Sequence, residues 1–126
     1  MTKEQVKINI QDIDTESGLG LCDDDFDVYI NSLRIFAGVV PETLNKIKTV
    51  SADTIKEYAV NAHGIKGMSQ YIGAMEASKQ ALKAEQLAKS QDVKGTIALN
   101  DSFIEYMEKL IGNIKSWLLE YDEKPV

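Results

Sequence analysis

A broad apolar stripe near the end of the chain limits the possible folds more than any other sequence feature. The spacing predicts a long helix capped by Asp92, and a face this wide fits a helix that packs against two neighbours in a bundle. A two-stranded coiled coil is the alternative, but its seam would be narrower. The stripe keeps close to a seven-residue repeat through Ile97, Ile104, Met107, Ile111, Ile114, Leu118 and Tyr121, and Phe103, Leu110 and Trp117 widen it.

An earlier helix is predicted to start at the acidic cluster Asp23-Asp24-Asp25, where negative charge suits the helix dipole. Gly38 is expected to interrupt this helix near its end, and Pro41 suits the first turn of a new helix that docks Leu44 and Ile47. One face of the earlier helix is apolar, through Phe26, Tyr29, Ile30, Leu33, Phe36, Ala37 and Val40.

Two further helices are predicted to form a hairpin about Gly73. The first spans 55–72, with Ser51 or Asp53 as its cap, and the second spans 74–89. The second carries a stripe of small residues that would let two helices approach closely, namely Ala74, Ala77, Ala81, Ala84 and Ala88.

Residues 1–22 show a loosely alternating apolar pattern but no partner strand, and a lone strand is not stable. We therefore expect an extended lead-in that lays Ile10, Ile13 and Leu19 against the bundle. The fold prediction is all-α: an up-and-down four-helix bundle over 23–122, with an additional N-terminal helical or extended segment and a tail over 123–126.

Composition excludes several function classes. The 126 residues suffice for one domain, and the 44% hydrophobic and 27% charged residues are typical of a soluble globular protein. A formal net charge of −6 argues against nucleic acid as a partner. No apolar run is long enough for a membrane span and no signal peptide opens the chain, so we expect a cytoplasmic protein, by default a monomer.

Metal sites are not predicted. Cys22 is the only cysteine and His63 the only histidine, so the usual zinc site cannot be built and no metal- or acid/base-dependent enzyme is indicated. The acidic cluster does not fit a calcium loop, because Val28 stands where the loop needs glycine and Arg34 where it needs a bidentate acid.

His63 lies on the predicted 55–72 helix between features that weaken it. Gly64 and Gly67 together cost roughly 2 kcal/mol of helix stability relative to alanine. On a helix, His63, Lys66, Gly67 and Gln70 share one face, turned away from the core. A histidine can carry a group covalently, Lys66 could pair with a phosphoryl group, and Gly67 would leave room for a second macromolecule.

The hairpin register brings part of the 74–89 helix within a turn of His63. Glu85 and Gln86 are the candidates there to hydrogen-bond one ring nitrogen and so determine the tautomer of the histidine.

The run His63-Gly64-Ile65-Lys66-Gly67, followed by Gly73-Ala74, resembles the signature of histidine-containing phosphotransfer (HPt) domains. The similarity includes the Tyr29/Leu33/Phe36 helix, the acidic loop before it and the Ala84-Glu85 pair. It implies a four-helix bundle that relays phosphoryl groups, with His63 as phosphoacceptor, Lys66 as the adjacent cation and Gly67 as the small residue that gives access. It also implies response-regulator receiver domains or a hybrid histidine kinase as partners, with Mg²⁺ on the receiver and no cofactor on this chain.

The expected function is therefore that of a phosphocarrier and not of an enzyme, since no nucleotide-binding motif is present. A receiver would dock on an apolar face that includes Ala59, Val60, Gly64, Gln70 and Tyr71, with Gly67 and Met68 beside them. The alternative is an acidic helical bundle that binds a signalling partner through the same face without chemistry. Covalent phosphate on His63 would distinguish the two.

Overall fold

The structure is a computed structural model that describes residues 8–123. All of its regular elements in that range are helices, as predicted. The first residues of the predicted lead-in and most of the tail over 123–126 lie outside the described range. The helices are α1 (Thr15–Leu21), α2 (Phe26–Lys46), α3 (Ile55–Tyr71), α4 (Met75–Lys89) and α5 (Val93–Glu123).

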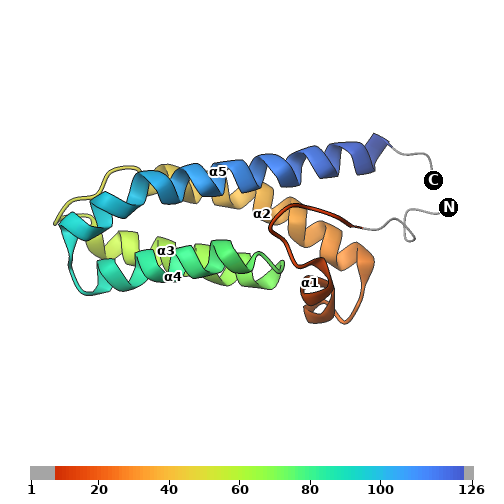
Figure 1. Ribbon diagram of the computed structural model, residues 1–126, viewed down its shortest axis with the longest axis horizontal. Helices are drawn as coiled ribbons and strands as arrows, with labels where there is room; N and C mark the ends of the chain where they lie inside the picture. Colours follow the sequence, from red (N-terminus) through yellow and green to blue (C-terminus); the bar gives the residue numbers. More distant parts are fainter. Residues whose placement is uncertain (1–7, 124–126) are drawn as a thin grey trace.

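Helices α2 to α5 form the predicted up-and-down bundle. Figure 1 shows α2 and α5 running side by side along the long axis, with the α3–α4 hairpin packed along one part of them. Helix α1 lies beside the first part of α2, next to the turn between α3 and α4. The core therefore lies between the α2/α5 pair and the hairpin.

The apolar stripe of α5 enters this core, with one correction at its first turns. Ile97 is exposed, and Thr96 and Asn100 take the buried positions instead. Asn100 is held by two hydrogen bonds: its amide donates to the carbonyl of Ile47 (2.7 Å), and its side-chain oxygen accepts from the hydroxyl of Tyr58 (2.8 Å). These bonds make burial of the amide tolerable.

Helix α2 is continuous where two helices were predicted. Neither Gly38 nor Pro41 ends it, and the expected new helix at Pro41 does not form separately. A proline inside a helix costs about 3 kcal/mol. Val40 and Leu44, on either side of Pro41, are both buried on the core face, and that burial stabilises the continuous helix.

The lead-in is partly helical rather than extended. Asp14 caps α1 by accepting a hydrogen bond from the backbone N–H of Ser17 (3.1 Å). Gly18 lies so close to the ring of Tyr29 that a Cβ would not fit there. Ile10, Ile13 and Leu19 pack against the core, as predicted.

The helix caps agree with the predictions in part. Asp25 caps α2 and Asp92 caps α5, each through its side chain. Helix α3 is preceded by Thr54, so neither Ser51 nor Asp53 caps it as predicted. The Thr54 hydroxyl accepts from the backbone N–H of Ser51 (3.0 Å) and leaves the α3 end without a side-chain cap. None of the helices in residues 8–123 could cross a membrane.

Candidate functional site

The α3–α4 hairpin positions the site. Its turn contains Gly73 at a φ of 85°, a conformation that favours glycine. The stripe of alanines on α4 is buried, and such small side chains let the backbone of α3 lie close. As a result the middle of α4 faces His63 across the hairpin.

Glu85 is the centre of a charged cluster beneath the histidine ring. Only 2% of its side chain is exposed, yet three groups contact its carboxylate. Nδ1 of His63 lies 2.8 Å from Oε2, Nζ of Lys66 lies 2.9 Å from Oε1, and Nζ of Lys89 lies 3.0 Å from Oε2. The ring itself is 63% exposed.

These contacts keep Glu85 ionised. Burial by itself raises the pKa of Glu85, but hydrogen bonds from Lys66, Lys89 and His63 outweigh it and lower the pKa from its ordinary 4.5 to about 2. A buried carboxylate with this many charge-assisted bonds is an acceptor only. The buried charge is therefore compensated.

The ionised carboxylate assigns the tautomer of the ring. Because Glu85 can only accept at Nδ1, that nitrogen carries a proton, and in the neutral ring Nε2 keeps its lone pair. The bond is made at Nδ1 while most of the ring is exposed. The arrangement leaves Nε2 of His63 as the nucleophilic atom.

The surface around the ring is open. A Cβ added at Gly64 or Gly67 would meet no described heavy atom within 4 Å outside its own helix backbone. Val60, Gln70 and Tyr71 are exposed on the same helix, and Met68 is half-buried. Ala59 was predicted to line this face but is only 8% exposed, because it lies on the core side of α3.

An apolar groove lies beside this surface, between α2 and α3. We call it the α2–α3 groove; its lining is Ser32, Ile35, Phe36, Gly67, Met68, Tyr71 and Ile72. Ile35 is exposed and was not predicted as a site residue. The sequence could have indicated a binding surface here, because Ile35 is an apolar residue outside the buried face of α2. At one end of the groove, the thiol of Cys22 donates to the hydroxyl of Tyr71 (3.5 Å) and so helps to orient that ring.

The two candidates for the ring contact differ in position. Glu85 lies under His63, whereas Gln86 is exposed and lines a shallow depression between α4 and α5. Lys89 was not predicted as part of the site. Its spacing of four residues from Glu85, typical of a helical ion pair, was the available signal.

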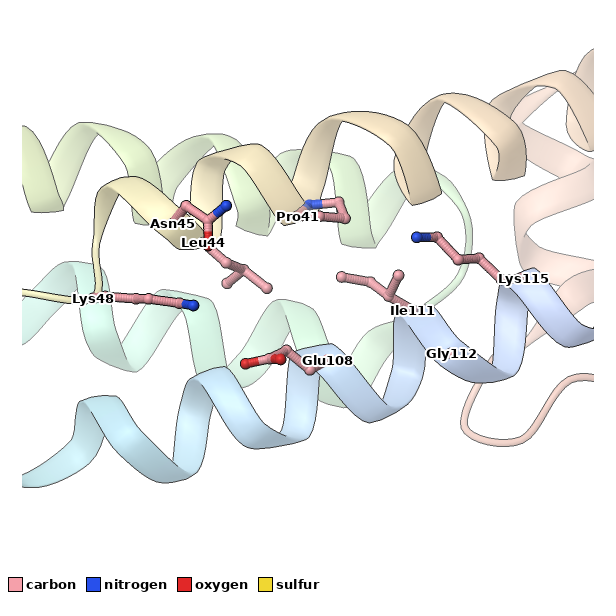
Figure 2. A pocket seen from close by; sticks show the side chains of 8 residues that line it. All are labelled: Pro41, Leu44, Asn45, Lys48, Glu108, Ile111, Gly112 and Lys115. Carbon is pink, nitrogen blue, oxygen red and sulfur yellow. The ribbon is translucent and has the colours of Figure 1, made fainter.

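A second cavity, of about 250 Å³, lies between α2 and α5 (Figure 2). Leu44 and Ile111 face each other across it, and Lys48, Glu108 and Lys115 lie around them. None of its lining residues belongs to the charged cluster at His63. In residues 8–123, no group of His, Cys, Asp and Glu side chains is arranged to hold a metal ion.

The family model described as Hpt domain matches residues 31–118, a range that contains the charged cluster and the α2–α3 groove. No curated protein and no solved structure gave a match.

Proposed function

The chain belongs to the Hpt domain family, and from this premise we propose that it carries a phosphoryl group on Nε2 of His63. The family acts in phosphorelay signal transduction by histidine phosphotransfer, and its members interact with receiver domains and histidine kinases. The observation that carries the proposal is the exposed ring of His63 held through Nδ1 by the buried carboxylate of Glu85.

The transfer step follows from that contact. The lone pair of Nε2 attacks the phosphorus of an aspartyl phosphate on a receiver domain. The new N–P bond forms as the P–O bond to the aspartate breaks, and the aspartate leaves as a carboxylate with the electron pair. The ring gains positive charge and keeps the proton on Nδ1, which donates it in a hydrogen bond to Glu85, so no proton has to leave. The same steps in reverse deliver the phosphoryl group to a second receiver.

Glu85 stabilises the phosphorylated ring. Its negative charge stabilises the ring cation that forms on phosphorylation, and electrostatic stabilisation of developing charge is a major contribution to catalysis. Lys66 contacts Oε1 and Lys89 contacts Oε2 of the same carboxylate, so positive charge is available beside the ring for the phosphoryl oxygens. The divalent metal ion that phosphoryl transfer uses would come with the receiver.

The receiver would dock over the α2–α3 groove and the glycine surface beside the ring. A chain with a net charge of −6 gains little from overall attraction to an acidic receiver active site, so apolar contacts would supply the affinity. Ile35, Met68 and Tyr71 offer these contacts. Gly64 and Gly67 let the partner backbone approach the ring.

The first experiment requires no partner. The wild type and His63→Gln are treated with phosphoramidate, a small phosphoryl donor, and their intact masses are measured. We expect one acid-labile, alkali-stable phosphate on the wild type and none on the variant. The variant should remain folded, because the ring is 63% exposed and the contacts of Lys66 and Lys89 with the carboxylate of Glu85 remain.

A folded wild-type protein that takes up no phosphate would contradict the proposal. The same groove would then favour the alternative, a bundle that binds a signalling partner without carrying phosphate. If phosphate is taken up, mixing the phosphorylated protein with receiver domains and following its loss would identify the partners.

A further inference from the structure

The two lysines on Glu85 are not equivalent. Lys66 comes from α3, contacts Oε1, and has a side chain that is 24% exposed. Lys89 comes from the last turn of α4, contacts Oε2, and has a side chain that is 66% exposed. Oε2 is also the atom that accepts from the His63 ring, so Lys89 and the ring share one carboxylate oxygen.

Before phosphorylation, the positive charges in the cluster outnumber the negative charge of the Glu85 carboxylate. With a neutral ring, one carboxylate faces two ammonium groups, which leaves one positive charge in excess. A phosphoryl group adds up to about two negative charges, and the ring to which it is attached becomes a cation. The phosphorylated cluster is then close to neutral, but only if both lysines remain.

The exposure of the two lysines indicates which one moves. Lys66 is largely enclosed, and removing it from Glu85 would leave a buried charge with less compensation, which is costly. The side chain of Lys89 is mostly in water, which solvates its ammonium group when it leaves Glu85, so moving Lys89 costs less than moving Lys66. It also stands next to the ring, because both contact Oε2.

We propose that Lys89 is the cation that pairs with the phosphoryl oxygens of phosphorylated His63, while Lys66 stays on Glu85 as its counter-ion. Before phosphorylation, the ion pair with Glu85 thus holds the ammonium group of Lys89 beside the ring. This inference rests on the proposed function, and it reverses the role that the sequence suggested for Lys66. A lysine that merely compensates the helix dipole at the end of α4 would have no such effect.

The test compares phosphate uptake from phosphoramidate by intact mass in the wild type, Lys89→Ala, Lys89→Gln and Lys89→Arg. Lys83→Ala is the matched control, since Lys83 is an exposed lysine of the same helix that lines the depression between α4 and α5. We expect Lys89→Ala and Lys89→Gln to take up phosphate about fivefold more slowly, the effect of one solvated charge pair in contact. Lys89→Arg should retain most of the rate, and Lys83→Ala all of it.

The ³¹P spectrum of the phosphorylated protein gives a second readout that a purely structural role would not change. We expect the phosphohistidine resonance to shift in Lys89→Gln and to stay in place in Lys83→Ala. Uptake rates and resonances in Lys89→Ala and Lys89→Gln that equal those of Lys83→Ala would overturn the inference while leaving the proposed function intact. Failure of the wild type to take up phosphate would overturn the proposed function, and this inference with it.

Discussion

Nδ1 of His63 lies 2.8 Å from Oε2 of Glu85, so a ring that is mostly exposed is hydrogen-bonded to a carboxylate that is buried. The contact joins α3 to α4 and makes the state of the ring depend on a carboxylate that solvent scarcely reaches.

The tautomer of His63 should follow from this bond. We expect ¹⁵N spectra of the wild type to show the neutral ring protonated at Nδ1, because ionised Glu85 only accepts. In Glu85→Gln the amide can donate or accept, so both tautomers should appear. A wild-type ring protonated mainly at Nε2 would contradict the assignment of Nε2 as the phosphoacceptor atom.

Low pH should reduce the stability of the fold, because it protonates Glu85. Because its folded pKa, about 2, lies below the ordinary 4.5, the ionised form stabilises the folded state above about pH 5, and this contribution is lost as the pH falls toward 2. The full contribution is about 3 kcal/mol. Urea unfolding between pH 6 and 2 should therefore show a smaller loss of stability in Glu85→Gln than in the wild type.

The control for this experiment is Glu57→Gln, which removes an exposed glutamate from α3. Its stability should fall with pH in parallel with the wild type. If the curve of Glu85→Gln is also parallel to the wild type, then the ion pairs of Glu85 do not stabilise the fold.

Glycine at position 67 should make α3 less stable than alanine would, but it should give a partner access to the ring of His63. A methyl group fits there without meeting a described heavy atom outside its own helix backbone, so Gly67→Ala should raise the free energy of unfolding by about 1 kcal/mol. We expect phosphate transfer from a receiver domain to become slower, because the partner must approach the ring over this surface. Uptake from phosphoramidate, which is small, should be nearly unchanged.

Gly112→Ala is the matched control, since Gly112 is an open glycine of α5 away from the ring. It should gain similar stability and leave transfer from the receiver unchanged. Equal transfer rates in the two variants would show that Gly67 is not part of the docking surface.

Ile35 should contribute to receiver binding and little to stability. Its side chain is exposed and lines the α2–α3 groove, so Ile35→Asn should weaken binding of a receiver domain by about 1 kcal/mol or more in calorimetry. Leu119→Asn, at an exposed leucine of α5, is the control and should bind normally. If both variants bind as the wild type does, then the receiver does not dock over this groove.

The sequence by itself determined what lies within each helix. The spacing of apolar residues gave the bundle, Gly73 marked the end of the helix that carries His63, and the alanine stripe of α4 indicated a tightly packed face. The periodicity also placed His63, Gly67 and Gln70 on an exposed face. These inferences succeed because local backbone hydrogen bonds set the position of every side chain around a helix.

Relations between elements were decided by the tertiary structure. Both Glu85 and Gln86 were within a turn of the ring, and only the rotation of α4 against α3 directed Glu85 inward and Gln86 outward. The same packing buried Ala59, kept α2 helical through Pro41 and brought Lys89 to Glu85. Such outcomes depend on how whole faces fit together, and a helical period shows which side chains share a face but not what that face meets.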